Sequence, residues 1–271
     1  MKKFQNKVAL ITGSSMGIGK TLAYELAKKG ARIVLNARNE KRLLRTYEEM
    51  KSAGYDVTSV AGDVTSEEDC QRMVDQAIST FGQLDILINN AGLSTEGEIG
   101  ELAGSVCRKI IEVNYLGSVF ATQAALPQLE KSKGSVIFIG SVAGLRGLPN
   151  FSIYSSSKMA LTALAESMRI EQAKKGVHVG LAYVGFTRND VEKTIYNSAG
   201  ELIPQPKRDF IKAEEPVVVA NRIIRMIEKR TFKKVFTSLG KLNAVLCRIA
   251  PGVVHTILGT NYRKRKAEEM S

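Results

Sequence analysis

Short apolar runs alternate with longer amphipathic stretches along most of this chain. The runs have the length of buried strands, and the stretches between them repeat apolar residues at helical spacing. We expect strands at residues 7–11, 32–36, 56–61, 84–89, 134–140, 177–183 and 233–237. Repeated strand–helix units of this kind predict an α/β fold, a doubly wound parallel sheet with helices on both faces.

The length and composition agree with one domain of this type. The chain has 271 residues, of which 44% are hydrophobic and 24% charged, so it can bury a full core. The last strand–helix unit ends near residue 237, and the chain contains no internal repeat or low-complexity linker. We therefore expect a single domain over residues 1–237 and a C-terminal extension over residues 238–271.

A glycine-rich turn follows the first expected strand. The run Thr12-Gly-Ser-Ser-Met-Gly-Ile-Gly19 lies between an apolar strand and a helical pattern. Its glycines permit a sharp turn and a close approach of a pyrophosphate, while the helix start offers unpaired N–H groups and a positive dipole end. A glycine-rich stretch can also be an ordinary loop, so its place between strand and helix is what favours a dinucleotide site.

A tyrosine and a lysine form a second candidate site. In Tyr154-Ser-Ser-Ser-Lys158 the two side chains are four residues apart and share one helical face, so the ammonium can lie beside the phenol. A free phenol titrates near ~10, and a fixed cation beside it is expected to lower the pKa of Tyr154. With Ser141 to hold a substrate oxygen, the three can move a proton to or from an alcohol or ketone.

Together these features resemble the classical short-chain dehydrogenase/reductase family over about residues 5–237. The residues that carry the resemblance are Gly13, Gly17, Gly19, Asp63-Val64, Asn89-Asn90-Ala91-Gly92, Asn114, Ser141, Tyr154 and Lys158. The resemblance implies a Rossmann-type sheet of about seven strands. It also implies an NADP(H)-dependent oxidoreductase that interconverts a ketone and a secondary alcohol by hydride transfer.

The resemblance assigns roles to four catalytic residues. Ser141 donates a hydrogen bond to the substrate carbonyl, and Tyr154 gives the carbonyl oxygen a proton. Lys158 lowers the pKa of the phenol and binds the nicotinamide ribose. Asn114 holds a water that links the lysine to solvent, although an asparagine here can also simply cap or bend its helix. The serines between Tyr154 and Lys158 are interpreted as spacers.

The end of the second strand bears on the choice of cofactor. In Val34-Leu-Asn-Ala-Arg38, Asn36 stands where an NAD site usually has an acid, and Arg38 follows it. An arginine can bind a 2′-phosphate that a carboxylate would repel, which favours NADP; a solvated surface Arg38 is the alternative. The cofactor-binding residues implied by the resemblance are Gly13, Ser15, Met16, Gly17, Ile18, Gly19, Asn36, Arg38, Asp63, Val64, Asn90, Tyr154, Lys158 and Thr187.

One segment departs from the family pattern. Where the family usually has Pro-Gly-x-x-x-Thr, this chain has Val184-Gly-Phe-Thr-Arg-Asn189. Gly185 is retained, and Thr187 occupies the position whose backbone meets the cofactor carboxamide in the family. Loss of the proline frees the φ angle and restores an N–H group, so the cofactor's pose becomes less defined. We expect residues 186–215 to form a mobile lid over the substrate.

The C-terminal extension is basic and amphipathic. Residues 228–271 contain ten Lys/Arg and three Glu, a net charge of +7 of the chain's +12. Residues 239–259 are mostly apolar but too often interrupted by polar groups and a proline to make a good spanning helix. One apolar helical face is expected, formed by Leu242, Val245, Leu246 and Ile249.

This apolar face, followed by the basic run Arg263-Lys-Arg-Lys266, predicts peripheral contact with an anionic membrane through residues 239–266. The alternative is a helix packed on its own domain or on a second subunit. Because the family often forms dimers or tetramers, we expect a homo-oligomer. The location expected is cytoplasmic, with peripheral contact at the membrane surface.

Membrane contact would suit a lipophilic substrate, either steroid-like or a long-chain keto-lipid, and thus a role in lipid metabolism. Residues 37–43, 113–119 and 125–127 resemble the membrane-associated branch that includes hydroxysteroid dehydrogenases and keto-sphinganine reductases. A soluble reductase of small carbonyls is the second hypothesis. A non-catalytic NADP-binding regulator is the third, and the presence of Ser141, Tyr154 and Lys158 argues against it.

Other classes of protein have little support. Cys70, Cys107 and Cys247 are isolated, which indicates a reducing compartment and small buried hydrophobes rather than a metal site. Two histidines are too few for a metal site, and His178 is expected to be a hydrogen-bonded core residue. The charge lies at one end without a recognition motif, so no nucleic-acid partner is expected. The first strand begins almost at once, so neither a signal peptide nor an N-terminal anchor is expected.

Overall fold

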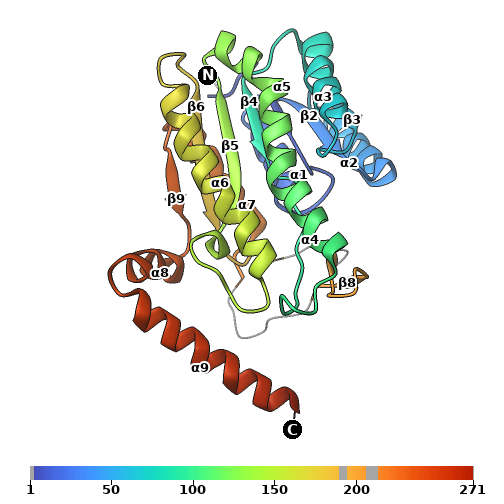
Figure 1. The fold of residues 1–271 in the computed structure, drawn as a ribbon. Coiled ribbons are helices and arrows are strands. Elements are labelled where there is room, and N and C mark those ends of the chain that lie inside the picture. Colours follow the sequence, from blue (N-terminus) through green and yellow to red (C-terminus); the bar gives the residue numbers. More distant parts are fainter. Residues whose placement is uncertain (1–2, 189–193, 206–212, 271) are drawn as a thin grey trace.

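A seven-stranded parallel sheet forms the centre of the molecule (Figure 1). The computed structural model describes residues 3–188, 194–205 and 213–270. The strand order is β3-β2-β1-β4-β5-β6-β9. The strands are β1 (Val8–Ile11), β2 (Arg32–Ala37), β3 (Val57–Ala61), β4 (Ile86–Asn89), β5 (Ser135–Ser141), β6 (His178–Val184) and β9 (Lys233–Val235). All seven predicted strands are confirmed, with ends that differ by at most two residues.

Helices cover both faces of the sheet, as predicted. One face packs against α1 (Gly17–Lys28), α2 (Glu40–Ser52) and α7 (Pro216–Glu228). The other face packs against α3 (Glu67–Phe81), α5 (Gly117–Ser132) and α6 (Ser152–Glu171). Successive strand residues enter opposite layers: Ile11 faces the first layer and Leu10 the second. Because both layers are apolar, the central strands are mostly apolar, whereas the edge strands β3 and β9 contain polar residues such as Thr58, Ser59, Lys233 and Lys234.

The order of strands reverses between β1 and β4, so the connections that leave these two strands run to opposite faces of the sheet. A reversal of this kind opens a crevice beyond the carboxyl ends of the strands, where α/β proteins bind their ligands. Beside this crevice, α4 (Gly104–Ile111) continues through a short π-helix (Glu112–Leu116) directly into α5. A 3₁₀ turn (Val142–Gly144) follows β5.

The expected lid contains an antiparallel hairpin, β7 (Thr194–Tyr196) and β8 (Leu202–Pro204). The hairpin is attached to the loop after β4, because the N–H of Tyr196 donates to the carbonyl of Ser94 at 2.9 Å and its carbonyl accepts from the N–H of Glu96 at 3.2 Å. Asn189, which replaces the usual threonine, lies outside the described residues.

The C-terminal extension is helical, as predicted. It forms α8 (Ser238–Ile249) and α9 (Pro251–Met270), which are separated at Ala250. Helix α8 starts against the end of the sheet, and α9 extends beyond the body of the molecule past the ends of α4 and α6 (Figure 1). Among the residues that the structure describes, no helix has both the length and the apolar character needed to cross a bilayer.

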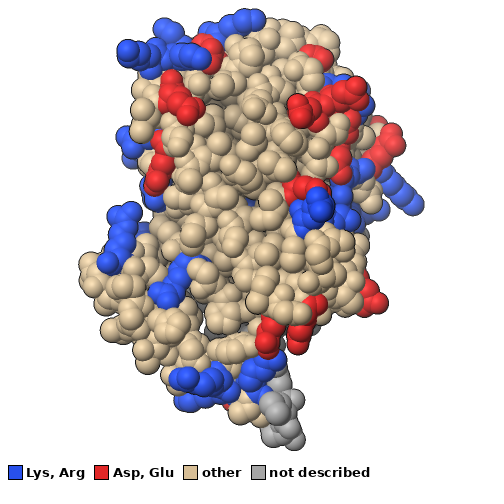
Figure 2. Space-filling view, viewed as in Figure 1, with Lys and Arg blue, Asp and Glu red and all other residues tan. Residues whose placement is uncertain are grey.

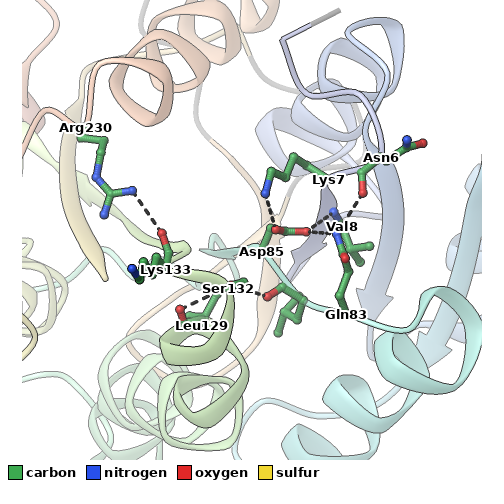
Figure 3. A network of polar contacts seen from close by, with 10 residues as sticks. Asn6, Lys7, Val8, Gln83, Asp85, Leu129, Ser132, Lys133 and Arg230 are labelled. Carbon is green, nitrogen blue, oxygen red and sulfur yellow. Dashed lines mark hydrogen bonds and ion pairs between the residues drawn. The ribbon is translucent and has the colours of Figure 1, made fainter. Parts of the chain in front are cut away.

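A buried carboxylate is hydrogen-bonded on several sides at the amino end of the sheet. The buried carboxylate of Asp85 accepts hydrogen bonds from the Lys7 ammonium at 2.7 Å, the Val8 N–H at 2.9 Å and the Gln83 amide at 2.6 Å (Figure 3). The Ser132 hydroxyl donates to the carbonyl of Leu84 at 2.8 Å. This network ties the chain at the starts of β1 and β4 to the end of α5.

Candidate active site

The glycine-rich turn after β1 leaves no room for side chains. Gly13 and Gly17 have φ angles of 63° and 56°, in the left-handed region that favours glycine. A Cβ atom on Gly13 would lie 2.9 Å from the Cα of Ala91, and one on Gly19 would collide with the Asn90 side chain and lie 2.5 Å from the carbonyl oxygen of Gly13. The turn thus brings bare backbone to the crevice, as close contact with a pyrophosphate requires.

The start of α1 is open to an anion. Its N-cap residue is Met16, whose side chain has no oxygen and makes no capping hydrogen bond. The first turn contains no acid either. The free N–H groups and the positive end of the dipole therefore remain available, so these residues fit the diphosphate of a dinucleotide.

Thr12 and Asn90 fix the glycine-rich turn by hydrogen bonds. The amide of Asn90 donates to the carbonyls of Thr12 and Gly13 at 2.9 and 3.0 Å. The hydroxyl of Thr12 accepts from the N–H groups of Asn90 and Ala91, both at 3.0 Å. Asn90 therefore acts here on the backbone of the turn, which joins the ends of β1 and β4.

Asn36 and Arg38, both predicted to bind the cofactor, have different environments. Asn36 is buried, and its amide donates to the carbonyls of Val60 and Gly62, both at 3.2 Å, so it ties β2 to β3. Arg38 is half-exposed and lies 3.4 Å from the carboxylate of Asp63. Burial raises the pKa of the Asp63 carboxyl, but the hydrogen bonds from Thr65 and the charge of Arg38 outweigh it and hold that pKa below its usual range.

A second arginine, which the sequence analysis missed, lies beside the turn. The guanidinium of Arg42, on the first turns of α2, is 3.2 Å from the sulfur of Met16. Asn39 caps α2 by accepting a hydrogen bond from the N–H of Arg42 at 2.9 Å. The positive end of α2 and two guanidinium groups therefore border the end of β2. Arg42 stands three residues after the N-cap Asn39, so a basic residue in the first turn of a capped helix was the available signal.

The three residues of the proposed proton transfer come together between β5 and α6. The Ser141 hydroxyl lies next to the Tyr154 phenol, near enough to lower its pKa. Lys158 is buried, and its ammonium donates to the carbonyl of Ile139 at 3.0 Å. A Cβ atom on Gly144 would lie 2.8 Å from the carbonyl oxygen of Lys158, so this glycine allows the turn after β5 to approach α6 closely.

Burial works against the expected lowering of the phenol's pKa. It raises the pKa of Tyr154 above its ordinary value, and the neighbouring Ser141 hydroxyl opposes that shift without cancelling it. The ammonium of Lys158 donates to the Ile139 carbonyl. Helical spacing brought the two residues to one face, but the direction of a long side chain depends on acceptors elsewhere in the fold.

Asn114 is wholly buried in the π-helix before α5. Its side chain accepts from the N–H of Leu93 at 2.7 Å and donates to the carbonyl of Leu93 and to the hydroxyl of Ser157, both at 2.9 Å. Ser157 in turn donates to the carbonyl of Tyr154 at 2.7 Å. Ser157 is therefore no spacer: it links Asn114 to the turn of α6 that carries Tyr154. A single-turn π-helix is frequent at functional sites.

The other predicted cofactor residues border the same crevice or support it. Ser15 contributes its carbonyl to the Thr46 hydroxyl at 3.2 Å, and Ile18 packs against the core. Val64 is buried beneath Gly117, where a Cβ atom would lie 3.0 Å from the Cβ of Val64. Thr187 follows the end of β6 and pairs with Glu214 in a short bridge.

Two further predictions outside the site can be checked. His178 is a buried core residue as predicted: its ring nitrogens lie 3.2 Å from the Ser135 hydroxyl and 3.1 Å from the Thr231 carbonyl. Burial raises the pKa of the Cys70 thiol to about 12, which leaves it unreactive. Among the described residues there is no group of three His, Cys, Asp or Glu side chains that could hold a metal.

Comparison with known proteins agrees with this geometry. A family model described as short chain dehydrogenase matches residues 7–199. The chain belongs to the short-chain dehydrogenase/reductase family. Among its relatives are the 11-beta-hydroxysteroid dehydrogenase A of Sesamum indicum, 35% identical over 84% of this chain and 66% of the relative, and the 11-beta-hydroxysteroid dehydrogenase-like 2 of Arabidopsis thaliana, 35% identical over 93% and 80%.

These relatives place the chain in the hydroxysteroid dehydrogenase branch of an oxidoreductase family, although it spans only about two thirds of the length of the sesame protein. A solved short-chain dehydrogenase/reductase from Burkholderia phymatum in complex with NAD matches 91% of this chain and 94% of its own, with a TM-score of 0.81 and 26% identity. An alcohol dehydrogenase from Thermococcus sibiricus complexed with 5-hydroxy-NADP matches 86% and 97%, with a TM-score of 0.75 and 27% identity.

Proposed function

We propose that this protein interconverts a ketone and a secondary alcohol with NADP(H). The observation that carries the proposal is that the Ser141 and Tyr154 side chains lie next to each other at the carboxyl edge of the sheet, on the same edge as the glycine-rich turn. A bound nicotinamide cofactor supplies or accepts the hydride. Tyr154 exchanges the proton with the substrate oxygen, Ser141 orients that oxygen by a hydrogen bond, and Lys158 lies buried behind them.

A protonated Tyr154 is the form that ketone reduction requires. Because burial raises its pKa, the phenol carries its proton at neutral pH and can donate it to a developing alkoxide. Asn114 and Ser157 hold the backbone around Tyr154 through the bonds described above. The alcohol-forming direction therefore needs no prior deprotonation of the tyrosine.

Two arginines support NADP as the cofactor. Arg38 and Arg42 both border the end of β2, and the Asp63 carboxylate beside them is paired with Arg38. A 2′-phosphate can accept charge-assisted bonds from either guanidinium. We expect Arg38→Ala and Arg42→Ala each to raise the KM for NADPH about tenfold and to leave the KM for NADH unchanged.

Arg45→Ala, at an exposed position of α2, the helix that contains Arg42, is the matched control. It should leave the KM for NADPH and the KM for NADH unchanged. Equal effects of the Arg38 and Arg42 variants on the two cofactors, or a wild-type preference for NADH, would contradict NADP specificity.

A lipophilic ketone, steroid-like or long-chain, is the proposed substrate. The relatives named as hydroxysteroid dehydrogenases support it. So does an open groove of about 410 Å³ between α9 and the residues before α6, with Leu148, Pro149 and Leu258 in its lining. Helix α9 borders this groove because the Tyr262 hydroxyl donates to Glu98 at 2.6 Å and Arg146 donates to the Pro251 carbonyl at 3.2 Å.

The test is NADPH oxidation with steroid, long-chain and small ketones, for the wild type and Tyr154→Phe. We expect turnover with lipophilic ketones and a loss of about 1,000-fold or more in kcat for Tyr154→Phe, with NADPH binding retained. Turnover of small ketones alone would favour the soluble carbonyl reductase. Tight NADPH binding without turnover of any ketone would favour the non-catalytic regulator.

We also propose a cytoplasmic protein in peripheral contact with an anionic membrane. Leu239, Leu242 and Ile249 of α8 are 76%, 55% and 73% exposed, and the surrounding surface is basic (Figure 2). Apolar side chains beside cations suit the interface of an anionic bilayer. Flotation with anionic vesicles, abolished in Leu242→Glu and in neutral vesicles, would support this; a dimer that buries the same face would instead dissociate in Leu242→Glu.

A homo-oligomer is proposed through α5 and α6. Figure 2 shows a broad, mostly uncharged surface over these helices, and Met159 of α6 is 42% exposed on it. Light scattering in solution should give the mass of a dimer or tetramer for the wild type and a smaller mass for Met159→Glu. A monomeric wild type would contradict this part of the proposal.

A further inference from the structure

Arg222 of α7 joins the residues just before its helix to the end of β9. Its Nη1 atom lies 2.7 and 2.9 Å from the two carboxylate oxygens of Glu214 and donates to the carbonyl of Phe236 at 3.0 Å. The guanidinium also lies 5.8 Å from the centre of the Phe236 ring. With side chains 36% and 24% exposed, Arg222 and Glu214 form a partly buried pair rather than a surface one.

Glu214, in turn, fixes the backbone that follows β6. Its N–H donates to the carbonyl of Phe186 at 2.8 Å, and its carbonyl accepts from the N–H of Arg188 at 2.8 Å. These two bonds bracket Thr187, which forms an isolated bridge with Glu214. The described start and end of the segment between β6 and α7 are therefore fastened to each other at this point.

The fastened backbone lies beside the residues that perform the chemistry. In the sheet, Val184 at the end of β6 pairs with Ser141 at the end of β5. Residues 185–187 come directly after Val184 and so leave the sheet next to the Ser141 hydroxyl. Since a dinucleotide lies across the carboxyl ends of the strands, its reacting end has to pass this backbone to reach Ser141 and Tyr154.

The same point holds the start of the C-terminal extension. Phe236, which accepts from Arg222, precedes Thr237, whose hydroxyl caps α8 by accepting from the N–H of Gly240 at 3.0 Å. A Cβ atom on Gly240 would lie 2.8 Å from the side chain of Val142, next to Ser141. One on Gly185 would collide with Thr237. The start of α8 is thus packed against both sides of the site.

We propose that Arg222 is a positioning residue for the nicotinamide half of the cofactor. Val184 leaves the backbone after β6 without the fixed φ angle of a proline, so the turn depends on contacts from outside it. Arg222 supplies them: it holds the Glu214 carboxylate, Glu214 holds residues 186–188, and the bond to Phe236 couples this unit to α8. This inference rests on the proposed cofactor but not on any particular ketone substrate.

The test compares two ligands of the full-length protein by titration calorimetry. NADPH has both halves of the cofactor, whereas 2′,5′-ADP has only the adenosine half with its phosphate. We expect Arg222→Gln and Glu214→Gln each to weaken NADPH binding about tenfold, with 2′,5′-ADP binding unchanged. The double variant should be no worse than Arg222→Gln alone, because that variant already removes the contact with Glu214. NADH and AMP, titrated in parallel, cover a preference for NAD.

Arg225→Gln is the matched control, since Arg225 is an exposed arginine on the same helix, and it should leave both affinities unchanged. Arg222→Lys keeps the charge and should recover part of the NADPH affinity if Arg222→Gln folds poorly. Equal weakening of both ligands, or unchanged NADPH affinity in the folded variants, would overturn the proposal. A wild type that binds neither ligand of either pair would overturn the proposed function along with it, whereas binding without ketone turnover leaves this inference standing.

Discussion

The two ends of the central sheet differ in their polar groups: those at the amino end are hydrogen-bonded within the chain, and those at the carboxyl end are open to a ligand. At the amino end, the buried Asp85 carboxylate accepts bonds from Lys7, Val8 and Gln83, and every one of these bonds is internal to the chain (Figure 3). At the carboxyl end, the N-cap residue of α1 makes no side-chain capping bond, and glycines allow neighbouring backbone segments to pack closely. The same strands thus end in a closed network on one side and an open crevice on the other.

This difference separates stability from function. A buried charge is tolerated when it is paired and hydrogen-bonded, and breaking one partner is costly. An uncapped helix start costs stability too, and it persists where a ligand can satisfy it. We therefore expect changes at the amino end to alter the free energy of unfolding and changes at the carboxyl end to alter ligand binding or turnover.

The largest effect is expected from Gly19→Ala. The added methyl group would collide with the Asn90 side chain and approach the Gly13 carbonyl, which displaces the turn that receives the diphosphate. An overpacking cost of about 3 kcal/mol corresponds to a loss of ~100-fold in cofactor affinity, measured by calorimetry. Gly104→Ala, with no neighbouring atom within 4 Å of the added carbon, is the control. Unchanged affinity in Gly19→Ala would argue against a dinucleotide at this turn.

Asp85→Asn tests the amino end. The neutral amide presents an N–H group where the carboxylate accepted one, so Lys7, Gln83 or the Val8 N–H loses its acceptor. We expect the free energy of unfolding in urea to fall by about 2–3 kcal/mol, with kcat/KM per folded molecule unchanged. Asp75→Asn, in an exposed contact with Gln71, is the control. A loss of activity without a loss of stability would reverse the assignment of the two ends.

His178 gives the amino end a pH dependence. Burial lowers its pKa from 6.5 to about 4, and the charge of Arg230 acts in the same direction against the bond to Thr231. His178 therefore binds a proton below pH ~6.5 in the unfolded chain, but only below about pH 4 in the folded protein. Stability from this residue is present above pH ~6.5 and falls by about 3 kcal/mol as the pH drops to about 4.

The measurement is urea unfolding between neutral pH and about pH 5, above the range where carboxyl groups titrate. His178→Gln should flatten the dependence in this interval. An unchanged slope in His178→Gln would show that other groups cause it.

The smallest effect is expected from Ser157→Ala. This change removes the bonds that link Asn114 to the backbone of Tyr154, while Asn114 keeps both contacts with Leu93. A cost of about 1 kcal/mol in positioning predicts a drop of roughly fivefold in kcat/KM. Ser167→Ala, an exposed serine on the same helix, should have no effect, and equal effects of the two would return Ser157 to the role of a spacer.

Much of the fold could be predicted because the signals are local. Each strand is a short apolar run between turn residues, and each covering helix repeats apolar residues at helical spacing. The glycine-rich turn and the spacing of Tyr154 and Lys158 are also local, so the sequence brought the right residues to one edge of the sheet. Other contacts join separate elements, so the spacing of residues along the chain could not predict them. These are the contacts of Arg42 with Met16, of Ser157 with Asn114, and of Arg222 with Glu214 and Phe236.

The sequence by itself determined the order of elements, the family and the groups available for chemistry, because these depend on residue type and spacing along the chain. Only the tertiary structure decided what those groups do in place. It turned the Lys158 ammonium to the Ile139 carbonyl, raised the pKa of Tyr154 by burial, and turned the Asn36 amide toward β3. The physical reason is that desolvation and hydrogen-bond direction depend on neighbours that folding brings together from distant positions.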